Sequence, residues 1–112
     1  MAVEVTGENF DKVLKEKNIT MLDFWAPWCG PCKMLSPTID SLHDDNKENN
    51  ITIGKVNVDE NSELASKFGV RGIPTILFFK DGVEIPNSKI VGIRQKDDLQ
   101  KTINLLLEKV EA

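Results

Sequence analysis

The chain has two cysteines, which lie three positions apart in the stretch MLDFWAPWCGPCK, residues 21–33. Two thiols at this spacing are able to supply half of a metal site, a permanent structural disulfide or a reversible redox pair. A structural zinc site takes roughly four Cys or His ligands. Beyond Cys29 and Cys32 the chain has one histidine, His43. A zinc site within one chain therefore lacks ligands, which leaves open only a site shared between chains.

A permanent structural disulfide is also a poor explanation for the pair. The loop between Cys29 and Cys32 is so short that closing it contributes only about 2 kcal/mol on the chain-entropy estimate. At 112 residues, the chain is long enough to bury a core without such help. Reversible redox chemistry remains as the favoured interpretation.

The residues around the pair suit a reactive thiol. Cys29 follows a predicted strand and precedes a predicted helix, so its sulfur would face the helix's unpaired N–H groups and positive dipole end, which stabilise a thiolate. Gly30 allows close backbone approach, and Pro31 suits a first helical turn, where no N–H is needed. Side chains three apart on a helix are close enough to form a disulfide after modest adjustment. We expect Cys29 to be the exposed attacking thiol and Cys32 to be less accessible.

Asp23 is a lone acid in the apolar segment 20–26. Its carboxylate is either exposed on the strand or buried, at a cost of several kcal/mol if it stays ionised and unpaired. Burial would raise the pKa toward neutrality, which suits a group that accepts and donates protons. Lys55, in the predicted strand 51–59, is a candidate partner for Asp23. The alternative is two solvated charges on neighbouring strands.

Composition narrows the class of protein. The net charge of −4 argues against a nucleic acid or an anionic membrane as partner, because binding these requires clustered Lys and Arg. No apolar run approaches the roughly 20 residues that span a bilayer. The chain starts with Glu4 and Glu8 where a signal peptide would carry positive charge and then an apolar core, so we expect a cytoplasmic protein. No repeat or linker composition divides the chain, and a single domain over residues 1–112 is expected.

Hydrophobic patterning predicts strands that alternate with helices. Strands are expected over residues 3–6, 20–26, 51–59, 75–79 and 88–93. Helices are expected over residues 8–17, 30–46, 61–68 and 96–110. Strands separated by helices imply parallel crossovers, whereas Asp81-Gly82 indicates a hairpin and hence an antiparallel edge strand. The expected fold class is α/β, a mixed sheet with helices on both faces.

Three stretches, FWAPWCGPCKM, KVNVDEN and VRGIPTILFFKDG, resemble the thioredoxin family, and the resemblance extends over essentially the whole chain. WCGPCK followed by GIPT at residues 72–75 is far more specific than a bare Cys-x-x-Cys. The resemblance implies the thioredoxin fold, with a central mixed five-stranded sheet in the order 1-3-2-4-5. It also implies a cis peptide bond between Ile73 and Pro74, a form that an X–Pro bond otherwise takes in about one case in twenty.

The same resemblance implies a flat apolar groove for the substrate. Its expected lining residues are Trp28, Gly30, Pro31, Gly72, Ile73, Pro74 and Gly92. The backbone of Ile73 is expected to pair with an extended substrate segment, which is a form of strand addition. Of the two tryptophans, Trp28 is expected at the rim of the groove and Trp25 in the core. The stretch VEIPNSKIVGI is longer than the family pattern and contains Pro86, so the register of the last strand stays open.

The implied activity is that of a thioredoxin-type electron carrier, a protein-disulfide reductase that acts on disulfides in partner proteins. Cys29 would be the nucleophile, Cys32 the resolving thiol and Asp23 the proton-transfer group tuned by Lys55, with Cys29–Cys32 as the redox disulfide. The family implies no bound cofactor or metal, and re-reduction by an NADPH-dependent flavoprotein, thioredoxin reductase. We expect a monomer.

Two other functions compete with a reductase. The apolar groove alone would suit a binding module, in which the redox pair is incidental. An exported oxidase is disfavoured by the missing signal peptide and by the uncharged pair Gly30-Pro31, because a histidine there would stabilise the reduced form and make the protein an oxidant. The sequence therefore predicts a reductant.

Overall fold

The computed structural model describes residues 1–111, and it contains strands and helices close to those predicted. The strands are β1 (Val3–Glu4), β2 (Ile19–Trp25), β3 (Ile51–Asn57), β4 (Thr75–Lys80), β5 (Val83–Glu84) and β6 (Ile90–Val91). The helices are α1 (Phe10–Glu16), α2 (Gly30–Asp45), α3 (Ser62–Lys67) and α4 (Lys96–Glu111). Within residues 1–111, no helix is both long enough and apolar enough to cross a membrane.

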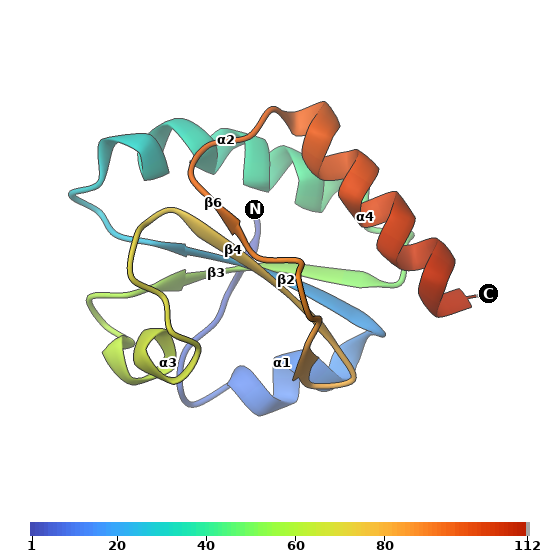
Figure 1. Ribbon diagram of the computed structural model, residues 1–112, viewed down its shortest axis with the longest axis horizontal. Coiled ribbons are helices and arrows are strands. Elements are labelled where there is room, and N and C mark those ends of the chain that lie inside the picture. Colours follow the sequence, from blue (N-terminus) through green and yellow to red (C-terminus); the bar gives the residue numbers. More distant parts are fainter. Residues whose placement is uncertain (112) are drawn as a thin grey trace.

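All the strands join one mixed sheet. The order is β1-β3-β2-β4-β5, and β6 pairs with β4 on the same side as β5. β1, β3 and β2 run parallel, whereas β4 is antiparallel to β2 and to both short strands after it. Figure 1 shows α2 and α4 on one face of the sheet and α1 and α3 on the other. This architecture confirms the predicted α/β thioredoxin fold.

Alternation along the central strands builds a core on each face. In β2, Ile19 and Met21 are fully buried and belong to the cluster beneath α2 and α4. Leu22 and Phe24 are equally buried and belong to the cluster beneath α1 and α3. Because successive side chains of a strand point to opposite faces, Asp23 lies on the same face as Ile19 and Met21, under α2. The sheet therefore holds a carboxyl group against the helix that begins after Cys29.

The antiparallel edge differs from the predicted single strand over residues 88–93. Only β6 lies within that range, and an additional short strand, β5, precedes it, so the sheet has six strands rather than the five expected. β5 pairs with Phe79 and Lys80, and β6 pairs with Thr75 and Ile76. Pro86 and Asn87 form a turn between β5 and β6, and Asn87 has a positive φ of 62°. The Ser88 hydroxyl donates to the Ile85 carbonyl oxygen at 2.7 Å across this turn. The extra residues of this segment thus form a turn outside the sheet, and β6 still pairs with β4 at Thr75 and Ile76.

Candidate active site

Cys29 and Cys32 form a disulfide at the N-terminus of α2, with their Cα atoms 5.2 Å apart. Cys29 has an extended backbone and is the N-cap, and its Sγ accepts a hydrogen bond from the backbone N–H of Cys32 at 3.2 Å. Pro31 lies in the first turn of the helix, where no N–H donor is needed. This geometry provides the helix N–H group that would stabilise a thiolate on Cys29 once the disulfide is reduced.

Both cysteines are largely shielded from solvent in this disulfide state. The exposed fraction is 5% for Cys29 and 1% for Cys32. The predicted order of accessibility is therefore correct, but the expectation of an exposed Cys29 is wrong for this state. The two sulfurs pack with Ala26, Trp25 and Ile73, and Cys29 is the more exposed of the pair.

The loop before β4 forms the opposite wall of the site. The Ile73–Pro74 peptide bond is cis, as the resemblance implied. Cys29 Sγ lies 3.8 Å from the carbonyl oxygen of Ile73. Gly92, with a positive φ of 93°, donates its N–H to the Pro74 carbonyl oxygen at 2.9 Å and so joins the segment after β6 to this loop. The structure thereby brings the predicted residues Ile73, Pro74 and Gly92 together beside the disulfide.

The other predicted groove residues lie at the start of α2 and in the loop before β4. Gly30 and Pro31 are exposed at the start of α2, and Gly72 is exposed next to Ile73. A methyl group on Gly72 would contact Val91 at 3.7 Å, so β6 lies directly behind this part of the loop. Trp25 is half-buried rather than fully buried, and it lines a cavity together with Cys32. The prediction of Trp25 as a core residue is thus only partly correct.

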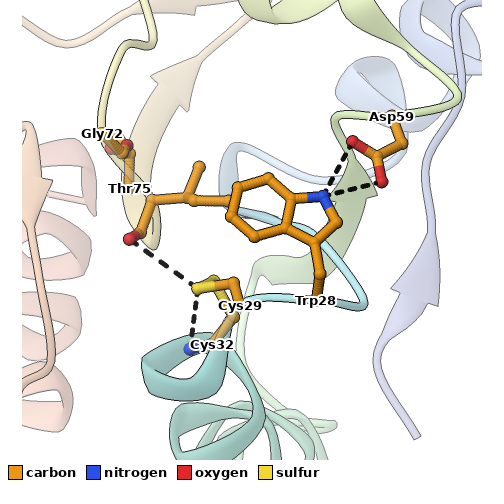
Figure 2. The surroundings of a disulfide bond; sticks show 7 residues. Trp28, Cys29, Cys32, Asp59, Gly72 and Thr75 are labelled. Carbon is orange, nitrogen blue, oxygen red and sulfur yellow. Dashed lines mark hydrogen bonds between the residues drawn. A yellow bond between two sulfur atoms is a disulfide. The ribbon is translucent and has the colours of Figure 1, made fainter.

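Trp28 has 69% of its surface exposed. Figure 2 shows its indole ring beside the disulfide with the ring nitrogen turned toward Asp59. Trp28 Nε1 donates to both carboxylate oxygens of Asp59, at 3.0 and 3.2 Å. Because Asp59 follows β3 and Trp28 follows the parallel neighbour β2, both residues lie at the same end of the sheet, beyond the carboxyl ends of these strands. This hydrogen bond orients an otherwise solvent-exposed aromatic ring.

We predict that Asp59→Ala weakens disulfide reduction without destabilising the fold. The hydrogen bond is exposed and contributes at most about 1 kcal/mol, so a two- to fivefold loss of kcat/KM is expected as the ring loses its fixed orientation. Reduction kinetics with a protein disulfide substrate, together with Trp28 fluorescence, measure the effect. Glu60→Ala is the matched control because it removes the neighbouring carboxylate without this bond. Equal rates for the two variants would contradict an orienting role for Asp59.

The acid predicted to transfer protons is buried. Asp23 is 1% exposed, and among the described residues no hydrogen-bond partner is present for its Oδ1. Burial raises the pKa of Asp23 to about 7, the positive charge of Lys55 acts in the opposite direction, and the negative charge of Asp40 adds to the increase. Both protonation states are thus populated near neutral pH, which is the condition for a group that takes up and releases protons.

Lys55 is the register partner of Asp23 on the adjacent strand, but its contacts are elsewhere. Its Nζ lies 3.1 Å from Asp40 Oδ1 and also donates to Ser36 Oγ. The expected partnership with Asp23 is therefore electrostatic and not a direct ion pair. The interpretation of Asp23 and Lys55 as two solvated charges is wrong, since Asp23 is buried and the Lys55 side chain is 15% exposed.

Sequence reasoning missed several residues of the site. Asp59 was detectable because it follows a strand that is parallel to the one before Trp28. Ser36 and Asp40 were detectable because they follow Cys32 at intervals of four, which places all three on one side of α2. Large apolar side chains also extend the exposed surface. They are Met34 (72% exposed), Val91 (55%) and Ile93 (42%).

The described residues hold no group of three or more His, Cys, Asp or Glu side chains arranged to bind a metal ion. The site's polar groups are instead a disulfide, a buried carboxyl group and backbone carbonyl oxygens. A cysteine pair at a helix N-terminus, closed by a cis-proline loop on a mixed sheet, defines a thiol-redox domain.

Comparison with known proteins agrees with this class. The family model named Thioredoxin matches residues 1–105. A thioredoxin of Rickettsia bellii is 45% identical over 105 residues, covering 93% of this chain and 97% of the relative. A thioredoxin of Bacillus subtilis is 43% identical over 102 residues, covering 91% and 94%. The solved structure of a mutant thioredoxin from Halobacterium salinarum superposes with a TM-score of 0.79 at 37% identity, covering 89% of this chain and 85% of that one.

The chain belongs to the thioredoxin family. Family membership and the Cys29–Cys32 pair together support the activity of a thiol-disulfide oxidoreductase.

Proposed function

We propose that this protein is a single-domain protein-disulfide reductase that carries electrons from a cellular reductant to disulfides in partner proteins. The observation that carries the proposal is the Cys29–Cys32 disulfide, which caps α2 and lies against the Ile73 carbonyl oxygen. In the working state this pair is the reduced dithiol, and the disulfide in the structure represents the product of one turnover.

The first step is attack by the Cys29 thiolate on one sulfur of the substrate disulfide. A bond forms between Cys29 Sγ and that sulfur, the substrate disulfide breaks, and the other substrate sulfur leaves as a thiolate that takes up a proton. The N–H groups at the start of α2 support the thiolate before attack, because the Cys29 sulfur already accepts the Cys32 N–H. The product of this step is a mixed disulfide.

The second step resolves the mixed disulfide. Cys32 transfers its thiol proton to the Asp23 carboxylate, and the resulting thiolate attacks Cys29 Sγ. The bond between Cys29 and the substrate breaks, the second substrate sulfur leaves as a thiolate, and the Cys29–Cys32 disulfide forms. Two electrons have then passed to the substrate. Support for Asp23 as the proton acceptor is its burial and its pKa of about 7, which matches the pH of the reaction.

Substrate recognition is proposed to use the surface around the disulfide. Trp28 forms the rim on one side, and the loop with Ile73 and Pro74 forms the other, with Gly92 behind it. An extended substrate segment would pair with the backbone of Ile73, and apolar substrate side chains would contact Trp28. Such a shallow surface suits many protein disulfides.

Regeneration requires two electrons and two protons from outside the chain. We assign this supply to a thioredoxin reductase, a flavoprotein that draws on NADPH, because that is the usual partner of the family. The protein itself would bind no cofactor or metal, and it would act as a monomer in the cytoplasm, on neither nucleic acid nor membrane.

A redox titration tests the direction of electron transfer. The protein is equilibrated in dithiothreitol buffers of graded potential, free thiols are alkylated, and the modified fraction of Cys29 and Cys32 is counted. We expect a two-electron transition near or below about −250 mV, because the uncharged Gly30-Pro31 pair adds no positive charge to stabilise the thiolate. A midpoint near about −180 mV or above would instead indicate an oxidase or isomerase. The absence of any reversible transition would contradict the proposed enzymatic function.

A binding module is the second candidate, and the exposed apolar surface favours it. Trp28, beside the disulfide (Figure 2), is 69% exposed, and Met34 on α2 is 72% exposed, and such apolar surface is able to hold a partner protein without redox chemistry. The two functions are compatible. They differ in whether partner binding requires Cys29.

A further inference from the structure

A charged cluster lies next to Asp23 on the face of the sheet covered by α2. The Lys55 ammonium group, on β3, makes its ion pair with Asp40 at 3.1 Å and donates a hydrogen bond to Ser36 Oγ. Both partners project from α2, one helical turn apart. The Lys55 and Asp40 side chains are 15% and 29% exposed, so solvent screens this pair less than it screens an ion pair on the open surface. Lys55 is thus held toward the helix although Asp23 is its register neighbour.

The carboxylate of Asp40 is itself fixed in place. Its Oδ1 accepts the backbone N–H of Ala2 at 3.0 Å in addition to the Lys55 ammonium group. Partial burial acts to raise the pKa of Asp40, but the hydrogen bonds from Ala2 and Lys55 and the nearby positive charges outweigh it, so the pKa is lowered. Asp40 therefore stays negatively charged throughout the range in which Asp23 titrates.

The groups that face Asp23 and Lys55 come from several elements. From α2 they are Ser36 and Asp40, which Lys55 contacts directly, while β4 contributes the apolar Ile76 as register partner of Asp23. The positively charged N-terminus at Met1 lies at the cavity that Lys55 and Asp40 share. Two further carboxylates line the cavity of about 460 Å³ that Lys55 and Asp40 share. They are Glu4 on β1 and Glu60 after β3. The charges of Lys55 and Asp40 both act on Asp23, and they act in opposite directions.

We infer that Asp40 and Ser36 are positioning residues for the proton-transfer step, which hold and neutralise the Lys55 ammonium group so that Asp23 remains able to exchange a proton at neutral pH. This inference rests on the proposed role of Asp23 in resolving the mixed disulfide. Without Asp40, the ammonium group would be uncompensated and free to turn toward the unpaired Oδ1 of Asp23. Asp23 would then be held as the anion and would be a weaker base toward Cys32.

The direct test is a carbon-13 NMR titration of the Asp23 carboxyl group in the full-length oxidised protein. In Asp40→Asn we expect the Asp23 pKa to fall by about 1, the low end of the effect of an adjacent opposite charge. Lys55→Gln should move it upward. Ser36→Ala, which removes only a hydrogen bond to Lys55, should lower it less than Asp40→Asn does, and Asp40→Glu should restore most of the wild-type value.

Asp45→Asn is the matched control. It removes the same charge from the same helix, but Asp45 pairs with Lys96 and not with Lys55. The Asp23 titration should be unchanged within error in this variant. If Asp45→Asn shifted it as far as Asp40→Asn does, the effect would come from net charge and the positioning role would be wrong.

The double variant Asp40→Asn/Lys55→Gln separates positioning from a direct field effect. If Asp40 acts through Lys55, most of its effect disappears once Lys55 is gone. An equal downward shift in both backgrounds would overturn the inference, and so would an unchanged or raised pKa in Asp40→Asn. Should Asp40→Asn fail to fold, Ser36→Ala decides, since an Asp23 pKa equal to that of the wild type would also overturn it.

These readouts need no catalytic activity, so they distinguish this inference from the proposed function. A wild-type protein that fails to reduce disulfides would refute the proposed function while the Asp23 titration still reported on Asp40. Where activity is present, the pH profile of mixed-disulfide resolution in Asp40→Asn should shift to lower pH with Asp23. An unshifted profile would contradict the positioning role.

Discussion

We expect Cys29→Ser to abolish disulfide reduction, and Cys32→Ser to stop the reaction after its first step, with the protein covalently joined to its substrate. Serine replaces the thiol with a hydroxyl that stays protonated at neutral pH, so the first variant lacks the attacking nucleophile, and a loss of at least about a thousandfold is expected. The second variant keeps Cys29 at the N-terminus of α2 with its sulfur facing the helix N–H groups. Attack should proceed, but no thiolate is left to resolve the product.

Non-reducing gels and intact-mass spectrometry with a protein disulfide substrate measure both outcomes. Cys32→Ser should accumulate one covalent adduct per chain, released by dithiothreitol, and Cys29→Ser should form none. The converse result, adducts through Cys32 alone, would reverse the roles of the two cysteines. A pull-down with Cys29→Ser also tests the binding module: retention of a partner by this variant supports docking independent of redox chemistry, and loss of that partner argues against it.

Local sequence patterns predicted most of the fold because each pattern has a simple physical cause. The almost wholly apolar run of β2 indicates a strand covered on both faces, and its side chains divide between the two cores. The helical spacing of Leu35, Ile39 and Leu42 marks the buried side of α2, but Met34, expected with them, is 72% exposed. The order of the strands came from the family resemblance rather than from these patterns. The edge of the sheet was less predictable, because a turn at Pro86 decides where pairing stops and resumes.

The candidate site was predictable where the motif is local and less so where it depends on tertiary contacts. Cys29, Cys32 and Pro31 are neighbours in sequence, and Pro31 indicates a helix that begins directly after Cys29. The partner of Lys55 was not predictable in this way. The register of β3 places Lys55 beside Asp23, but the rotation of α2 against the sheet offers Asp40 and Ser36 as closer partners. That rotation results from packing of the whole core.

The buried carboxyl group leads to the second large expected effect: Asp23→Asn stabilises the protein at pH 8 while it impairs catalysis. In the folded state the pKa of Asp23 is raised to about 7, whereas an unfolded Asp has a pKa of about 3.9. Between these values the folded chain holds a proton that the unfolded chain has released. Wild-type stability therefore falls as the pH rises from about 4 to about 7, and the loss is complete above pH 7.

The size of this effect follows from the pKa difference. Forcing the ionised group into the interior costs on the order of 4 kcal/mol at pH 8, and a neutral Asn avoids that cost but leaves its own buried amide poorly hydrogen-bonded. We expect Asp23→Asn to gain about 3 kcal/mol in the free energy of unfolding at pH 8. At pH 4 Asp23 is uncharged in the folded protein, so the gain should disappear and leave only the cost of the poorly hydrogen-bonded amide, a loss of about 1 kcal/mol.

Urea unfolding of the oxidised proteins at several pH values measures this dependence. Thr20→Val is the matched control, because Thr20 is also a buried residue of β2 whose hydroxyl lacks a hydrogen-bond partner among the described residues. Its effect on stability should not vary with pH, since it has no ionisable group. A gain in Asp23→Asn that is equally independent of pH would show that relief of a buried charge is not the cause.

The same variant should resolve mixed disulfides more slowly, by about a hundredfold near neutral pH, because general-base catalysis contributes at least that much and Asn accepts no proton. Single-turnover formation of the Cys29–Cys32 disulfide, followed against pH, measures this step. Higher stability combined with slower resolution means that the chain retains an unfavourable buried carboxyl group for its chemistry. A variant that was both more stable and fully active would contradict the role of Asp23 in proton transfer.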